Sequence, residues 1–199
     1  MVASDITVVI PHIPTRPNAL VRALKTVATQ TLRADDIIIA VDNDRQGSAI
    51  TRNRALMKVE TRWVAFLDDD DLLMPHHLET LLTHANDTGA DVVYPGCRVV
   101  NPELGGEIPL REEWGRFNQL FDPDLLRQKS YIPVTSLVRT SLARLAQFGP
   151  PTASDSHYDD WGFYVRLLDM YGAIFSHVPE ITWVWNHHGK NTSGRPDRW

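Results

Sequence analysis

The sequence has little cysteine and no long apolar run, and each shortage excludes a class of protein. The single cysteine, Cys97, cannot form an internal disulfide or supply a zinc site built from several cysteines. Near the N-terminus the apolar run 6–10 is too short for the core of a signal peptide or for a membrane span. We therefore expect a cytoplasmic protein without an integral membrane segment.

Positive charge is also in short supply. Twenty Lys and Arg residues oppose 25 Asp and Glu residues, so the net charge of −5 gives no overall field that would draw the chain to nucleic acid or anionic lipid. Hydrophobic residues make up 43% of the sequence, which is typical of a folded globular protein. At 199 residues we expect a single domain over 1–199.

Short apolar segments alternate with segments of helical period in the first half of the chain. This alternation predicts an α/β fold with a mainly parallel central sheet flanked by helices. The expected strands are 6–10, 37–41, 63–67 and 91–94, with helices after Pro17 and Pro75. Residues 95–131 look irregular and predict a functional loop region. Regular structure is expected again at 135–139, in helices at 141–148 and 160–171, and in strands near Ile174 and Trp183.

Four consecutive acids, Asp68 to Asp71, follow the predicted strand 63–67. Adjacent carboxylates repel one another unless a positive group neutralises them, and a hard divalent cation with oxygen ligands does so well. The carboxyl end of a strand is also where ligands bind in open α/β sheets. The pattern favours a site for Mn²⁺ or Mg²⁺, and the alternative is a solvated acidic turn before the helix at Pro75.

The segment 66–75 resembles the metal-binding segment of family 2 glycosyltransferases. Three more segments resemble landmarks of that family in the same order: 9–12 its first strand and turn, 40–44 its second strand end, and 51–55 its Ala-Arg-Asn element. The resemblance implies a GT-A fold. One departure is Asn43, which stands where the family usually has a second aspartate.

The resemblance also implies roles for residues in these segments. It assigns nucleotide-sugar binding to Pro11, His12, Asp42, Asn43, Arg52, Asp68 and Asp69, and metal binding to Asp68, Asp70 and Asp71. Within the acid run, Asp68 and Asp70 are the expected spaced pair. Two alternatives stay open, because Asp42 could cap a turn and Arg52 could be an ordinary exposed helix residue.

Two later segments resemble further parts of the family. Residues 157–167 resemble a string at a helix start, which implies that Asp160 is the general base, with Asp159 as the next candidate; the alternative is that both cap the helix. Residues 183–193 resemble a terminal loop, which implies that His187 or His188 completes the metal shell.

The resulting hypothesis is an inverting, metal-dependent transfer of a sugar from a nucleotide diphosphate donor, preferably UDP-linked, to a hydroxyl. We expect residues 1–94 to bind the nucleotide sugar and residues 95–199 to bind the acceptor and carry the catalytic base. The acceptor could be a protein, a glycan, a small molecule or a modified nucleobase. Two alternatives are a nucleotidyltransferase, which should carry a glycine-rich loop that is missing after Ile10, and a non-catalytic nucleotide-sugar-binding module.

Overall fold

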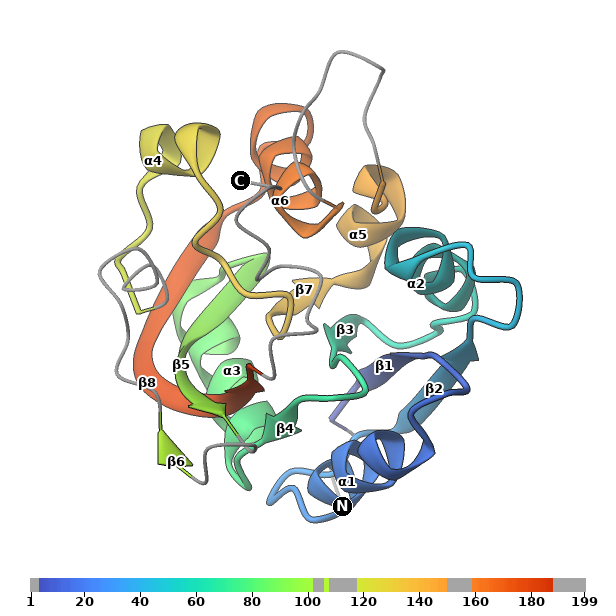
Figure 1. The fold of residues 1–199 in the computed structure, drawn as a ribbon. Coiled ribbons are helices and arrows are strands. Elements are labelled where there is room, and N and C mark those ends of the chain that lie inside the picture. The colour runs from blue at the N-terminus through green and yellow to red at the C-terminus, as the bar shows by residue number, and fades with distance from the viewer. Residues whose placement is uncertain (1–3, 102–105, 108–117, 150–158, 188–199) are drawn as a thin grey trace.

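One sheet organises the protein, with helices on both of its faces (Figure 1). The computed structural model describes residues 4–101, 106–107, 118–149 and 159–187. In chain order the strands are β1 (Ile6–His12), β2 (Asp36–Val41), β3 (Trp63–Phe66), β4 (Leu72–Leu73), β5 (Val92–Asn101), β6 (Gly106–Glu107), β7 (Leu137–Arg139) and β8 (Phe175–Asn186). Across the sheet they run β2-β1-β3-β7-β5-β8-β4, and β6 pairs with β5.

Parallel pairing dominates the sheet. Strand β1 runs parallel to both β2 and β3, and the long strands β5 and β8 are also parallel. The short strands β4, β6 and β7 pair antiparallel with their neighbours. Most paired residues belong to the three parallel pairs, which confirms the predicted mainly parallel sheet.

The helices form two layers. The helices are α1 (Pro17–Ala28), α2 (Ser48–Leu56), α3 (His77–Thr88), α4 (Pro123–Gln128), α5 (Thr140–Ala146) and α6 (Asp159–Asp169). One hydrophobic cluster joins the sheet to α1 and α3, and a second joins it to α2, α4, α5 and α6. Strand β1 is buried along its whole length because its side chains alternate between these clusters, Val9 toward one and Val8 toward the other.

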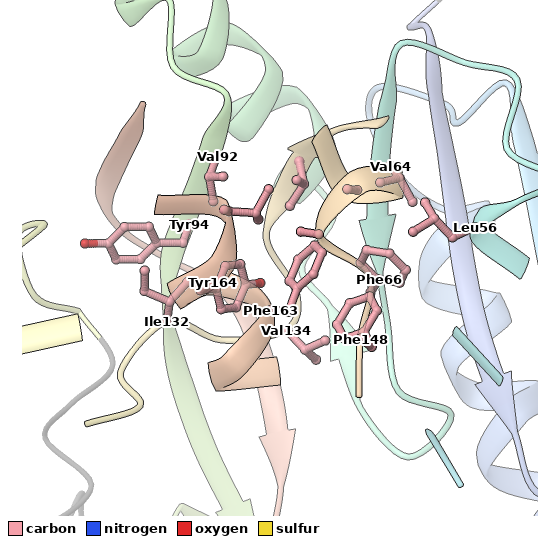
Figure 2. Close-up of a cluster of buried hydrophobic side chains, with 14 of the residues drawn as sticks. Leu56, Val64, Phe66, Val92, Tyr94, Ile132, Val134, Phe148, Phe163 and Tyr164 are labelled. Carbon is pink, nitrogen blue, oxygen red and sulfur yellow. The ribbon is translucent and has the colours of Figure 1, made fainter. Parts of the chain in front are cut away.

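Three phenylalanines connect the end of β3 to α6 (Figure 2). Phe148, just after α5, stacks on Phe163 of α6 with ring centroids 4.1 Å apart. Its edge also meets Phe66, the last residue of β3, at 4.8 Å. Such aromatic pairs add directional contacts to their large buried area. These contacts hold the first half of α6 against the end of β3.

Sequence and structure agree closely in the first half of the chain and differ after residue 94. The strand expected at 91–94 continues as β5 to Asn101, so the expected boundary between two functional halves lies inside a strand. The two strands expected near Ile174 and Trp183 form one strand, β8. The β5–β8 register shifts on both sides of Gly96, which marks a bulge in the paired strands. Proline and glycine at such a bulge look like loop signals in sequence.

The segment expected to be irregular also contains helix α4. Asp122 caps it by accepting hydrogen bonds from the backbone N–H groups of Asp124 and Leu125, and Pro123 occupies the first turn. The remaining expected elements appear within a few residues of their predicted bounds as β7, α5 and α6. None of the helices within the described residues has the length and apolar character that crossing a membrane requires.

Candidate active site

The ends of β1, β2 and β3 bring the first predicted site residues to one edge of the sheet. His12 pairs with Val41 in the β1–β2 register, and its carbonyl accepts a hydrogen bond of 2.8 Å from the Asp42 backbone N–H. The Leu67 backbone N–H likewise donates to the Val9 carbonyl. The acid run, His12 and Asp42 therefore share the carboxyl edge, where ligands bind in parallel sheets.

The four acids alternate between outward and inward positions. The side chains of Asp68 and Asp70 are 35% and 13% exposed, whereas that of Asp69 is only 1% exposed. Asp71 is also buried, at 3% exposure. The Asp71 backbone N–H donates to the Asp68 carbonyl, which closes a tight turn within the run. The expected spaced pair, Asp68 and Asp70, is therefore more exposed than Asp69 and Asp71.

Asp69 is held from three directions. Its carboxylate lies 2.7 Å from Nδ1 of His12, accepts a hydrogen bond from the Ile13 backbone N–H, and forms an ion pair with the Arg16 guanidinium at 3.2 Å. Burial raises the pKa of Asp69, although His12 and Arg16 oppose that rise. These contacts join the turn after β1 to the acid run, so the buried Asp69 holds these two segments in place.

Asp70 and Asp71 connect the run to the end of β8. Arg16 also forms an ion pair with the Asp70 carboxylate. Asn186 donates from its side-chain amide to the Asp70 carbonyl and from its backbone N–H to the Asp71 carboxylate, the latter at 3.0 Å. Burial and the neighbouring acids, Asp70 first among them, raise the pKa of Asp71 well above its usual range. Asp71 therefore has the surroundings of a structural acid.

Arg52 faces the acid run from α2. It is 5% exposed, its guanidinium bonds the Asp68 carboxylate, and its Cζ lies 5.3 Å from the centre of the Phe148 ring. A buried arginine against an acid and an aromatic face is firmly oriented. It is thus not the exposed helix residue that the sequence left open as an alternative. The next residue, Asn53, exchanges two hydrogen bonds with the Phe148 backbone and fixes that ring in place.

Asp42 organises the loop after β2. Its two carboxylate oxygens accept hydrogen bonds from the backbone N–H groups of Gln46, at 2.8 Å, and Gly47, at 2.9 Å. Gly47 has a φ of 95°, which few other residues adopt easily. Asp42 therefore caps a turn, while its proposed contact with a nucleotide stays a prediction. Asn43 beside it is exposed.

Asp160 lies in the first turn of α6. One of its carboxylate oxygens accepts a hydrogen bond of 2.9 Å from the Trp161 backbone N–H, one of the N–H groups at a helix start that have no partner within the helix. Burial raises the pKa of Tyr164, the Asp160 carboxylate adds to that rise, and the Arg52 guanidinium opposes it. Helices α2 and α6 pack into the same hydrophobic cluster, which brings the candidate base to the side of the sheet that holds Arg52.

The structure gives fewer contacts for the remaining candidate residues. Asp159 is the first residue of α6. The His187 backbone N–H donates to the Val100 carbonyl, and its ring meets the Trp185 ring edge-on with centroids 5.2 Å apart. His188 lies outside the described residues. Pro11 is buried within β1.

Sequence reasoning did not single out Arg16 or Asn186. Each bonds the acid run from a distant part of the chain, 54 residues away for the bond between Arg16 and Asp70 and 115 for that between Asn186 and Asp71. The only available signals were their positions, Arg16 in the turn after the first predicted strand and Asn186 at the end of a predicted strand. A single arginine or asparagine in such a place is too common to predict a partner.

The donor set of the acid run suits a hard divalent cation. Within the described part of the chain, no three His, Cys, Asp or Glu side chains are grouped so that they could hold a metal ion by themselves. Mg²⁺ and similar ions that bind nucleotides need only one or two carboxylates, because phosphate oxygens and water complete their shell. The outward oxygens of Asp68 and Asp70 fit that requirement.

Comparison with known proteins decides the family. Residues 42–143, more than half of the chain, match the profile of glycosyl transferase family 2. The chain belongs to this family. The matched segment includes Asp42, Arg52 and the whole acid run, so the glycosyltransferase prediction is confirmed.

Individual relatives agree with this assignment. YwdF of Bacillus subtilis, an uncharacterized glycosyltransferase, is 23% identical over 88% of this chain and 72% of its own. Solved structures of S. aureus TarS 1–349 in complex with UDP and with UDP-GlcNAc superpose with TM-scores of 0.68 and 0.69, at 17% and 16% identity. They cover 92% and 96% of this chain, which spans 60% and 61% of theirs. This likeness confirms the GT-A fold.

Proposed function

We propose that this family 2 glycosyltransferase transfers a sugar from a UDP-sugar to a hydroxyl acceptor with inversion, assisted by Mn²⁺ or Mg²⁺. The carrying observation is the alternation within the acid run, which turns Asp68 and Asp70 outward at the edge where β1, β2 and β3 end. TarS, whose fold this chain shares, has been solved with UDP and with UDP-GlcNAc, and this supports a uridine nucleotide as the donor.

Donor binding would use the charges already gathered at this edge. Asp68 and Asp70 would hold the cation, which when bound neutralises the diphosphate and its developing negative charge. Arg52 lies beside Asp68, where its guanidinium could also bind a phosphate oxygen without leaving its place, since planar arginine groups bind phosphate well. Asp42 and Asn43 would contact the ribose and base from the turn after β2. Each Asp42 oxygen accepts one loop hydrogen bond and keeps further acceptor capacity.

Asp160 would activate the acceptor. Its carboxylate takes the proton of the acceptor hydroxyl while the hydroxyl oxygen forms a bond to the anomeric carbon of the sugar. The bond from that carbon to the diphosphate oxygen breaks at the same time, and its electron pair leaves with the diphosphate. Attack from the opposite side in a single displacement inverts the anomeric configuration. A carboxylate is suited to this step because a neutral hydroxyl is a weak nucleophile.

Calorimetry with UDP, UDP-GlcNAc and GDP, each with Mn²⁺ and with EDTA, tests donor recognition. We expect the uridine nucleotides to bind in a Mn²⁺-dependent way and GDP to bind more weakly. Slow release of UDP from UDP-GlcNAc without an acceptor then separates an enzyme from a binding module. Binding that is indifferent to Mn²⁺ would reject the metal assignment, and a preference for GDP would reject the uridine donor. Intact-mass analysis after incubation with candidate glycans and proteins addresses the acceptor.

A further inference from the structure

Both outward carboxylates of the acid run are already neutralised by arginine side chains in the structure. Arg52 bonds Asp68, and Arg16 bonds Asp70. These are the two acids that the proposed function assigns to the divalent cation, and the present inference rests on that assignment. A cation that approaches Asp70 meets a positive group on the same carboxylate. Like charges at such short range repel strongly, so the cation and the Arg16 guanidinium compete for Asp70.

Arg16 is placed so that it can leave Asp70 without leaving the site. Its guanidinium bridges two acids, because its second amino group lies 3.2 Å from the buried Asp69 carboxylate. Asp69 is itself fixed by His12 and by the Ile13 backbone N–H, so it stays in place as an anchor. Release of Asp70 therefore costs Arg16 one of its two ionic contacts rather than both.

Open space lies next to this arginine. A pocket of about 630 Å³ is bordered by Arg16, Asp70 and Asn186, together with Asn18 and Arg22 of α1. The Arg16 side chain is 34% exposed, so its guanidinium has room to move toward that space. Arg52 lacks such freedom, because it is almost fully buried against the Phe148 ring. The two arginines thus differ in how easily they can give up an acid.

We propose that Arg16 is a built-in competitor of the divalent cation, which occupies Asp70 while the donor is absent and releases it when cation and diphosphate arrive together. The diphosphate favours this exchange in two ways. It adds negative charge that stabilises the incoming cation, and it offers the freed guanidinium new oxygen partners. The cation and the nucleotide then bind cooperatively, and each raises the affinity of the other by the same factor.

Electron paramagnetic resonance of free Mn²⁺ measures this competition without any catalytic turnover. Mn²⁺ is titrated into the protein with and without UDP for the parent, Arg16→Gln and Arg22→Gln. Arg22 lines the same pocket and no carboxylate partner is seen for it among the described residues, so its variant removes the same charge without breaking an ion pair to Asp70. We expect Arg16→Gln to bind Mn²⁺ alone about tenfold more tightly than the parent, with a smaller gain from UDP. Arg22→Gln should behave as the parent does.

A second variant guards against a folding defect, which thermal unfolding would reveal in Arg16→Gln. Arg16→Lys keeps the charge but cannot bridge Asp69 and Asp70 with a planar fork, so its Mn²⁺ affinity should fall between those of the parent and Arg16→Gln. If UDP binding by the parent requires Mn²⁺ but neither variant at position 16 binds Mn²⁺ more tightly, the competition proposal alone is wrong. If UDP binding by the parent ignores Mn²⁺, the metal assignment is wrong and the competition proposal falls with it.

Discussion

Two regions of the molecule bury ionisable side chains, but only one of them surrounds the buried group with charged partners. At the carboxyl edge of β1–β3, the buried Asp69 has an arginine, a histidine and a backbone N–H as partners. Between α3 and β8, His77 is completely buried and its Nδ1 lies 2.8 Å from the Thr182 hydroxyl. Its Nε2 has no hydrogen-bond partner among the described residues. Burial lowers the pKa of His77 to about 3, so this imidazole is neutral.

The difference separates a region built for ligands from one built for packing. A buried charge costs desolvation energy, and the protein retains such charge only where partners offset that cost. Partners that are themselves charged can be exchanged for a charged ligand, as proposed for Arg16. A neutral imidazole such as His77 offers no such exchange and instead fills the core. Substitutions at the carboxyl edge should therefore change binding or turnover, whereas changes around His77 should alter stability.

The largest effect is expected for Asp160→Asn, on turnover. Loss of a general base typically lowers the rate by about 10²–10⁴-fold, while donor and Mn²⁺ affinity should stay near parental values. Asparagine can still accept the hydrogen bond from the Trp161 backbone N–H, so this contact at the start of α6 survives. Steady-state kinetics with an identified acceptor checks this. Turnover within a few-fold of the parent would leave Asp160 as a cap only, and Asp159 would become the next residue to test.

Asp70→Asn should have the next largest effect, on donor binding in the presence of Mn²⁺. An amide lacks the charge that holds a hard cation, so we expect donor binding to weaken by about 2–3 kcal/mol and its Mn²⁺ dependence to disappear. Calorimetry with UDP measures both. Asp69→Asn is the informative partner variant. Because Asp69 is buried, Asp69→Asn should lower the melting temperature more than Asp70→Asn does, and it should weaken UDP binding less than Asp70→Asn does. The reverse pattern would contradict the assignment of outward and inward acids.

The sequence predicted where the site lies better than how its residues divide the work. A hydrophobic strand followed by acids located the acid run, the family resemblance located Asp42, and both lie at one edge of the sheet because parallel strands end there. Which acids turn inward depends on the turn that joins Asp68 and Asp71, and four identical residues carry no signal of that geometry. Arg16 was missed for a related reason, since ion pairs between distant turns follow from the finished fold.

The later half of the fold was harder to predict because its strands are interrupted. The register of β5 against β8 shifts on both sides of Gly96, and Pro179 lies in β8 between Val178 and Ile181, the partners of Pro95 and Gly96. Proline and glycine usually end strands, so the pattern favoured a loop there. Helix α6 was predicted well, since its hydrophobic residues recur at helical spacing and acids precede them.

Arg52→Ala compares a buried arginine with the exposed Arg54 of the same helix, α2. We expect the UDP-sugar dissociation constant to rise by an amount equivalent to about 2 kcal/mol, because a charged hydrogen bond to phosphate is lost. Arg54→Ala is the matched control, since Arg54 is exposed and, within the described ranges, its guanidinium donates only to the Val41 carbonyl. Calorimetry compares the two variants, after thermal unfolding has shown that each is folded. Equal UDP affinity in Arg52→Ala and Arg54→Ala would remove Arg52 from the proposed donor site.

The smallest effect concerns the other region, where the neutral His77 should make stability depend on pH. The unfolded chain binds a proton at this histidine below about pH 6.5, whereas the folded protein does not until about pH 3. The unfolded state is therefore favoured as pH falls through this window, with a slope that cannot exceed about 1.4 kcal/mol per pH unit. We expect a loss of roughly 1 kcal/mol between pH 7 and about pH 5.7 from His77 alone.

Urea unfolding of the parent and of His77→Gln across this pH range isolates that contribution. The raised pKa of Asp71 acts in the opposite direction, because stability from a carboxyl group with a raised pKa is lost as pH increases. The difference between the parent and His77→Gln cancels this term, since both proteins keep Asp71. We expect the parent to lose stability relative to His77→Gln as pH falls. Parallel pH profiles would show that His77 is protonated equally in both states, and the contrast between the two buried regions would then be wrong.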